Sequence, residues 1–359
     1  MDVGKLTLVV VRDGYSVSAT QIRSTRPMAA QILKGKTPAQ VLQIVPLLFS
    51  VCGRAQGAAA SAALQAAQQG ASAVSATVER TIACEAMQEH LWRVMLDWPR
   101  LQGLPQQEQR FTGWYAMLRK IGAGETDMSV FLHEFERDGL GMPLAEWWAL
   151  DSYRALQIWF SKVHSPVAQS LFKLAVLEQD RQGRAEARLL PAWTAAEAQK
   201  ACAGKWDAGF SARPEWLGGA AETGAWAYFA DSKLLRDTWQ QTGSKVLVRL
   251  LARVMDVAEM AGGSAAPRLD VASPSAGEGI AVVRTARGLL MHHVRLAAEQ
   301  VAEYEIVAPT EWNFHPDGAF AQDMRGLVEL DAGRLQQMAH IEVLSLDPCV
   351  AYELELRDA

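Results

Sequence analysis

The chain has 359 residues, of which 50% are hydrophobic and 21% charged, a composition typical of globular proteins and not of disordered or fibrous ones. Its 35 basic and 40 acidic residues give a net charge of −5, and no run of lysine or arginine provides the basic surface that nucleic-acid binding requires. The longest apolar stretch, residues 41–51, contains Gln43 and Pro46 and is too short to span a bilayer. The first residues predict a strand and a turn instead of a signal peptide. We therefore expect a cytoplasmic protein with no nucleic-acid or membrane partner.

The N-terminal third predicts a β-hairpin followed by helices. Apolar residues alternate over 6–10 and again over 15–17, and Asp13-Gly14 between them is a turn sequence suited to a hairpin. Thr37 is a suitable N-cap for a helix that begins at Pro38. Residues 55–76 are rich in alanine and contain no charged side chain, so we expect a helix packed in a crowded interior.

The middle of the chain predicts mainly helices. Amphipathic helices are expected over 77–98 and 105–120, a long helical region over 144–176 and a further helix over 231–261, ended by Gly262-Gly263. One buried helical face is expected to carry Ile82, Leu91, Val94 and Met95. The twelve tryptophans are expected to pack in the core or at interfaces, because no basic residues are interleaved with them as in a nucleic-acid stacking platform.

Two segments are poor in regular patterns. Residues 201–224 predict a long loop, and 262–279, composed mostly of Gly, Ser, Ala and Pro, predicts a linker. Strand patterns around 280–283, 289–294 and 304–307 then predict a small antiparallel sheet, followed by a short helical C-terminal region. The expected fold class is α+β and predominantly helical, in a single domain over 1–359 to which both loop-rich segments are internal.

The four cysteines, at positions 52, 84, 202 and 349, are too scattered for a Cys-x-x-Cys metal module or a disulfide framework. Cys84 and Cys202 are expected to be ordinary buried thiols. Cys52 precedes Gly53 at a loop-to-helix junction, where a helix N-terminus favours the thiolate that binds metals. Cys349 follows a turn-initiating Asp-Pro pair. Taken singly, Cys52 and Cys349 are also compatible with ordinary buried thiols.

Two internal motifs connect these cysteines to a known family. The sequence RGLLMH runs from Arg287 to His292 and the sequence PTEWN from Pro309 to Asn313, while ILKGK at 32–36 precedes the first cysteine. Together with the two cysteine segments they resemble the large subunit of nickel–iron hydrogenases. In that family an Arg-Gly-x-Leu-x-His strand and a Pro-Thr-x-Trp-Asn turn lie between an N-terminal and a C-terminal motif with two cysteines each. The resemblance implies a hydrogenase large-subunit-like helical core.

The chain departs from the family at half of the metal ligands. Cys52 and Cys349 match terminal nickel ligands of the family. The positions of the two bridging cysteines hold Ala55 and Tyr352, and the positions of two histidines hold Ala59 and Glu355. A binuclear centre that needs four thiolates cannot be assembled from two, so the resemblance implies that this chain is not a hydrogen-activating enzyme.

A large-subunit-like chain with half of the ligands resembles the HupK/HoxV-type hydrogenase maturation proteins. This resemblance implies a non-catalytic scaffold that holds or helps assemble the Fe(CN)2CO fragment and passes it to the large subunit, with maturation chaperones and the large subunit as partners. Low-spin iron that already carries strong-field ligands needs only one or two soft thiolates, and few ligands favour release. Iron is thus the expected transient cargo; nickel is not expected, because a nickel cargo would favour further histidines within ten residues of Cys52 or Cys349, and none is expected there. A metal-free structural mimic that binds chaperones, and a degenerate subunit with residual redox activity, are the alternatives.

The resemblance also assigns roles to residues around the cysteines. Arg287 is expected to hydrogen-bond cyanide nitrogen, against the alternative of a strand arginine paired with a surface carboxylate. The immediate surroundings of the two cysteines are expected to include Asp347, Pro348 and Gly53. Residues expected to be structural are Gly288, His292, Pro309, Thr310 and Asn313, with Thr310 and Asn313 bonding to backbone in a turn.

Two expectations concern relative placement. His292 and His293 are neighbours on a strand and face opposite sides, so at most one of them is expected to point inward. Cys52 and Cys349 lie 297 positions apart (349 minus 52), so only the global fold can bring them to one metal site.

Overall fold

The structure, a computed structural model, describes residues 4–25, 29–49, 52–178, 187–263, 265–329 and 331–359. The chain divides into two compact units. Unit 1 comprises Met1–Ile82, Ala185–Gly224 and Pro267–Ala359, and unit 2 comprises Ala83–Arg184 and Ala225–Ala266. The expected loop-rich segment 201–224 ends where the chain passes from unit 1 to unit 2, and the expected segment 262–279 contains the point where it returns to unit 1. That the two units act as one domain stays a prediction.

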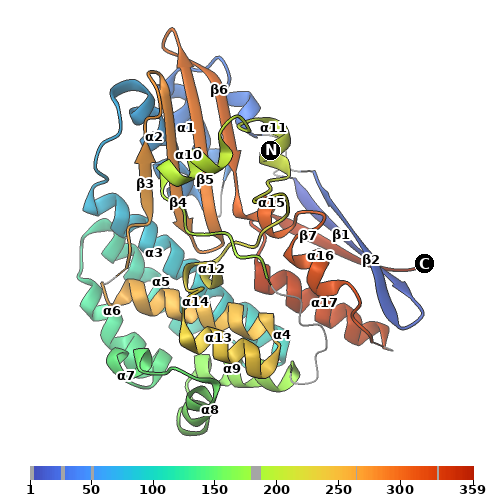
Figure 1. Ribbon diagram of the computed structural model, residues 1–359. Helices are drawn as coiled ribbons and strands as arrows, with labels where there is room; N and C mark the ends of the chain where they lie inside the picture. The colour runs from blue at the N-terminus through green and yellow to red at the C-terminus, as the bar shows by residue number, and fades with distance from the viewer. Residues whose placement is uncertain (1–3, 26–28, 50–51, 179–186, 264, 330) are drawn as a thin grey trace. The chain divides into compact units, whose positions relative to one another are not determined.

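The first sheet of unit 1 joins the two ends of the chain. Strands β1 (Lys5–Asp13) and β2 (Ser16–Ser24) form the predicted hairpin, whose turn contains Gly14 at φ +59°. Strand β7 (Ala351–Asp358) pairs with β1 in parallel, so the order is β2-β1-β7. Helices α16 (Ala319–Met324) and α17 (Ala332–Leu346) contribute to an apolar cluster with this sheet (Figure 1). The predicted C-terminal helices are therefore followed by a strand that was not expected.

The second sheet of unit 1 is the predicted antiparallel one. Its strands are β3 (Leu269–Ala272), β4 (Glu278–Thr285), β5 (Gly288–Ala297) and β6 (Gln300–Val307), in that order. Strand β3 pairs with β4 inside the segment 262–279, so the prediction of a linker there was wrong over these four residues. A buried Leu269 and the backbone bonds to β4 account for the strand in a segment whose composition favours a loop.

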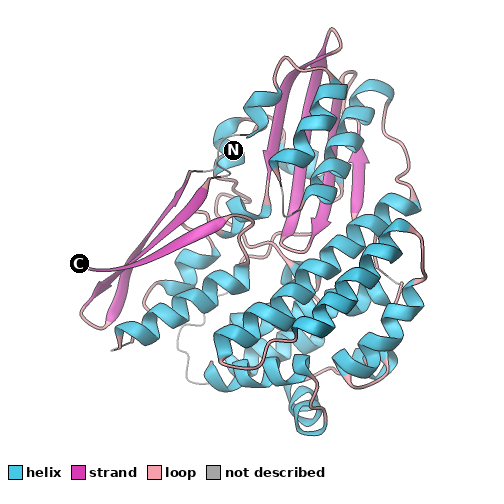
Figure 2. Cartoon of the chain, turned by 180° about the vertical axis from the view of Figure 1, so that it is seen from behind, coloured by secondary structure: helices cyan, strands magenta, loops and turns pink. Residues whose placement is uncertain are grey.

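Helices cover both faces of this second sheet. On one face lie the 3-10 helix η1 (Ala29–Leu33), α1 (Pro38–Leu48) and α2 (Gly53–Gln69), with the predicted N-cap at Thr37; Figure 2 shows this face. On the other lie α10 (Ala195–Cys202) and α11 (Ala208–Ala212) (Figure 1). Segment 201–224 thus contains a short helix besides the predicted loop.

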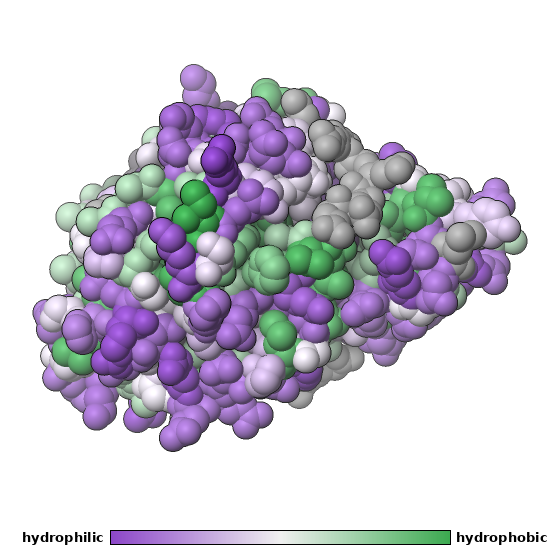
Figure 3. Space-filling model, turned by 90° about the horizontal axis from the view of Figure 1, so that it is seen from below, coloured by the Kyte–Doolittle hydropathy of each residue, from purple (hydrophilic) through white to green (hydrophobic). Residues whose placement is uncertain are grey.

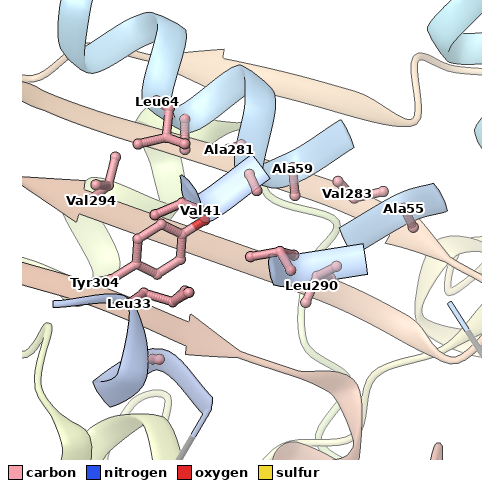
Figure 4. Close-up of a cluster of buried hydrophobic side chains, with 14 of the residues drawn as sticks. Leu33, Val41, Ala55, Ala59, Leu64, Ala281, Val283, Leu290, Val294 and Tyr304 are labelled. Carbon is pink, nitrogen blue, oxygen red and sulfur yellow. The ribbon is translucent and has the colours of Figure 1, made fainter. Parts of the chain in front are cut away.

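The alanine-rich helix α2 packs directly on the sheet, as expected for a crowded interior. Its small side chains form one buried cluster with β4, β5 and β6, drawn in Figure 4. The closest approach is at Gly279, where an added Cβ would lie 1.9 Å from the carbonyl oxygen of Ala63. Only glycine permits this contact between helix and strand.

In unit 2 the regular elements among the described residues are all helices, joined by loops and turns. Helix α3 (Ala76–Trp92) enters it, and the others are η2 (Arg93–Asp97, a π-helix), α4 (Trp98–Gln102), α5 (Glu108–Ala123), α6 (Met128–Glu134), η3 (Phe135–Leu140, a π-helix), α7 (Leu144–Trp148), α8 (Tyr153–Lys162), α9 (Pro166–Leu177), α12 (Ala225–Tyr228), α13 (Lys233–Thr242) and α14 (Lys245–Ala261). The predicted long helical region is three helices, because Ser152 and Ser165 cap new ones. The predicted helix over 231–261 is two, divided at Gly243 in the left-handed conformation.

The expected core positions are confirmed. All four apolar residues of the predicted buried face are buried. Five tryptophans are fully buried, namely Trp98, Trp114, Trp147, Trp159 and Trp312, but Trp92 and Trp148 are exposed, so core packing is not confirmed for these two. In Figure 3 hydrophobic residues lie in patches among hydrophilic ones on the face shown. Among the residues that the structure describes, no helix has the length and apolar character needed to cross a membrane.

Candidate functional site

Both cysteine motifs lie toward one end of the four-stranded sheet. Strand β5 starts at Gly288, directly after Arg287, and β6 ends two residues before helix α15 (Pro309–Asn313); because β5 and β6 are antiparallel, these points share one end. Helix α2 begins toward the same end, since Ala55 packs near Val283 whereas its later turns approach the start of β4 (Figure 4). Cys52, the residue that precedes α2, is therefore directed toward the end where the C-terminal motif lies.

Cys349 is held by the first turn of α15. Its backbone N–H donates to Thr310 Oγ1 at 3.2 Å, and the Thr310 hydroxyl donates to Cys349 Sγ at 3.1 Å. Pro309 occupies the first position of this helix. Thr310 thus makes a side-chain-to-backbone bond, the type expected from the sequence, and in addition contacts the sulfur.

A buried ion pair joins the central motif to the C-terminal motif. Arg287 Nε lies 3.3 Å from Asp347 Oδ1, and the two side chains are 5% and 0% exposed. Asp347 ends α17 in the left-handed conformation, at φ +54°, directly before Pro348. The alternative of Arg287 paired with a surface carboxylate is therefore wrong. The pair fixes the turn that presents Cys349.

Thr223 supports the start of β5, a role that no pattern in the sequence indicated. Its hydroxyl accepts from the backbone N–H of Leu289 at 2.9 Å, and its backbone bonds to the Asn313 side chain through both N–H (2.9 Å) and C=O (3.0 Å). Gly288 has φ +133°, and a Cβ there would lie 2.4 Å from Thr223 Cγ2. The Arg-Gly motif therefore needs glycine so that Thr223 can approach.

Cys52 is in contact with a buried polar group on its own helix. Gln56 Nε2 donates to Cys52 Sγ at 3.8 Å, one helical turn away. Gln56 Oε1 lies 2.9 Å from His292 Nε2, and His292 Nδ1 lies 2.9 Å from the hydroxyl of Tyr304. Burial lowers the pKa of His292 to about 3, so its ring is neutral.

His293 is also buried, so the expectation that at most one of the two histidines points inward was wrong. Its ring stacks on Trp206 with centroids 4.8 Å apart, and its Nε2 lies 2.9 Å from Glu278 Oε1. The two histidines do face opposite sides of β5, but helices and loops cover both faces of this sheet.

The four residues that stand where the hydrogenase family has further cysteines and histidines make packing contacts, hydrogen bonds or ion pairs within the fold. Ala55 and Ala59 are buried in the cluster beneath α2. Tyr352 lies in β7 opposite Leu6, with its hydroxyl 3.1 Å from Nδ1 of His340. Glu355, also in β7, pairs with Arg357 on the same strand. His340 precedes Cys349 by nine positions, so the premise that no histidine lies within ten residues of either cysteine was wrong. Burial lowers the pKa of His340.

The remaining cysteines behave as expected. Cys84 and Cys202 are buried, whereas Cys52 and Cys349 are half-buried. Burial raises the pKa of Cys202 to about 12, which keeps its thiol protonated. Among the described residues, no three His, Cys, Asp or Glu side chains are grouped to hold a metal ion.

Comparisons with known sequences point to hydrogenase proteins. The sequence model of the nickel-dependent hydrogenase family matches residues 233–353. The hydrogenase expression/formation protein HoxV of Cupriavidus necator is 30% identical over 357 residues, which cover 94% of this chain and 93% of that protein. The hydrogenase expression/formation protein HupK of Azotobacter vinelandii is 29% identical, with the same coverage of 94% and 93%.

Comparisons with solved structures agree on the fold. The Ni-Fe-Se hydrogenase from D. vulgaris Hildenborough matches with a TM-score of 0.62 at 16% identity, over 95% of both chains. The Ni-Fe-Se hydrogenase from Desulfomicrobium baculatum matches with a TM-score of 0.57 at 15% identity, also over 95% of both chains. The predicted fold class, α+β with a hydrogenase-like helical core, is confirmed.

Proposed function

The chain belongs to the family of hydrogenase expression/formation proteins that includes HoxV and HupK, and we propose that it is a non-catalytic scaffold for the Fe(CN)2CO fragment during hydrogenase maturation. The names of the similar proteins HoxV and HupK, hydrogenase expression/formation proteins, support a role in hydrogenase maturation. The identity of the cargo is our proposal. The partners of this chain, the maturation chaperones and the hydrogenase large subunit, are likewise proposed.

The observation that carries the proposal is the pair of half-buried cysteines, each with a hydrogen-bond donor directed at its sulfur. Gln56 donates to Cys52 and Thr310 donates to Cys349. A donor stabilises the negative charge of a thiolate, the form of cysteine that binds metals. The buried Ala55 and the strand residue Tyr352 offer no thiolate to bridge a second metal. The site is therefore suited to one iron and not to a binuclear centre.

The charge of the surroundings supports transfer of the cargo. Iron(II) with two cyanides and two thiolates is a dianion, whereas the positive charge of Arg287 is offset by the buried carboxylate of Asp347. Partial compensation of a buried charge weakens binding. A scaffold that must release its cargo to another protein requires such limited affinity, and a catalyst does not.

Infrared spectroscopy of anaerobically purified protein tests the proposal. Protein produced together with its maturation partners should contain iron and show bands of cyanide and carbonyl. Cys52→Ser and Cys349→Ser should each lose both, whereas Cys84→Ser, at a buried position in unit 2, should retain them. Wild-type protein without iron and without these bands would contradict the proposal.

The alternative of a metal-free mimic is favoured by one observation, the hydrogenase-like fold over 95% of the chain with structural residues at the former ligand positions. A Cys52→Ser/Cys349→Ser double variant that still supports hydrogenase maturation would establish the mimic. Hydrogen uptake by metal-loaded protein would instead establish a degenerate hydrogenase.

A further inference from the structure

A chain of three hydrogen bonds ends on the sulfur of Cys52. It starts at Tyr304 on β6, passes through His292 on β5 and crosses to Gln56 on α2, which contacts Cys52. Tyr304 and His292 are 0% exposed and Gln56 is 1% exposed. Figure 4 shows the Tyr304 hydroxyl pointing away from Leu33. Three strictly buried polar side chains from three elements thus lead to one of the two cysteines.

The direction of each bond in this chain follows from the donor and acceptor properties of the groups. The amide nitrogen of Gln56 faces Cys52, so its oxygen faces His292 and can only accept. His292 therefore carries its proton on Nε2 and accepts on Nδ1, and the hydroxyl of Tyr304 donates to Nδ1. Burial lowers the pKa of His292 and raises that of Tyr304, so both groups are neutral.

We propose that His292 and Tyr304 are positioning residues that act on Cys52 through Gln56. Tyr304 selects the tautomer of His292, and His292 in turn holds the Gln56 amide so that its N–H points at the sulfur. Without this restraint the amide can rotate by half a turn and present its oxygen, which repels a thiolate. This inference deepens the proposed function. It rests on the proposed function only for the identity of the metal that Cys52 binds.

The tautomer of His292 tests the inference without any metal. In protein labelled with ¹⁵N-histidine, the His292 ring should be neutral and protonated on Nε2 at pH 7. Tyr304→Phe keeps the aromatic ring but removes the donor, so the population protonated on Nδ1 should rise. A wild-type His292 protonated on Nδ1, or on both nitrogens, would refute the positioning role.

Cobalt(II) binding tests the consequence for the sulfur, because thiolate-to-cobalt charge-transfer absorption reports sulfur coordination. Removal of an outer partner of a metal ligand typically weakens metal binding by about 10- to 100-fold. We expect losses in this range for Tyr304→Phe and Gln56→Leu. Tyr352→Phe is the matched control, because it removes a hydroxyl that contacts another histidine, His340, and it should leave the affinity unchanged.

The outcomes separate the two proposals. Equal effects of Tyr304→Phe and Tyr352→Phe, or no effect of Tyr304→Phe on a wild-type protein that binds cobalt through Cys52, would overturn the positioning role. If wild-type protein shows no thiolate-to-cobalt absorption, the two-cysteine metal site fails, and the histidine tautomer still decides whether Tyr304 and His292 position Gln56.

Discussion

Substitution of Gly288 by alanine should disrupt the support of the candidate site. A Cβ at this position would lie 2.4 Å from Thr223 Cγ2, 2.7 Å from Thr223 Oγ1 and 2.9 Å from the backbone nitrogen of Gly224. The φ of +133° is also one that residues other than glycine rarely adopt. Backbone strain of this kind costs about 1–3 kcal/mol, and overpacking typically costs a further 1–3 kcal/mol, roughly. We expect Gly288→Ala to lower the free energy of unfolding by about 4 kcal/mol.

Urea unfolding of a double-mutant cycle measures this effect. Thr223→Ala alone leaves the buried N–H of Leu289 without its acceptor, which costs about 1–3 kcal/mol. It also removes two of the three close contacts that Gly288→Ala would make, so the double variant should be more stable than the sum of the single effects, by about 1–2 kcal/mol. Gly57→Ala on α2, where a Cβ meets only a side-chain atom at 3.4 Å, is the control and should not destabilise. A Gly288→Ala effect below about 1 kcal/mol, or strict additivity with Thr223→Ala, would refute the close-packing argument.

Three further outcomes are expected. Gly279→Ala should destabilise by about 3 kcal/mol or more in urea unfolding, because its Cβ would lie 1.9 Å from a backbone oxygen of α2, and a value near that of Gly57→Ala would show that the helix can move away. Metal-free protein in air should form a Cys52–Cys349 disulfide, detected by peptide mapping without reduction; free cysteines after aeration, or Cα atoms more than about 7 Å apart, would exclude a shared metal site. Because the folded protein keeps the Cys202 thiol protonated to a pKa of about 12 while the unfolded thiol ionises near pH 9, stability should fall as pH rises from 9 towards 12. Cys202→Ala should remove about 1.4 kcal/mol per pH unit of this decline in pH-dependent unfolding, and an unchanged slope would contradict the burial effect.

The sequence alone determined the elements whose causes are local. The hairpin turn at Gly14 and the helix start at Thr37 depend on residues within a few positions, and both are found where expected. The buried helix α2 follows from twenty-two residues without a charge, between Ala55 and Ala76. The divisions at Ser152 and Ser165 were also signalled locally, by N-cap residues, but the continuous apolar pattern across them favoured one long helical region.

The tertiary structure decided everything that depends on residues distant in the chain. Strand β7 exists because β1 offers it a parallel partner, for example Arg12 opposite Asp358. Both neighbouring histidines are buried because the sheet is covered on two faces, a property of its packing and not of its alternation. The site likewise depends on Thr223 beside Gly288 and on Asp347 beside Arg287. A motif identifies which side chains are available. The contacts that orient these side chains form only when separate segments pack together, because local sequence preferences do not depend on residues that are distant in the chain.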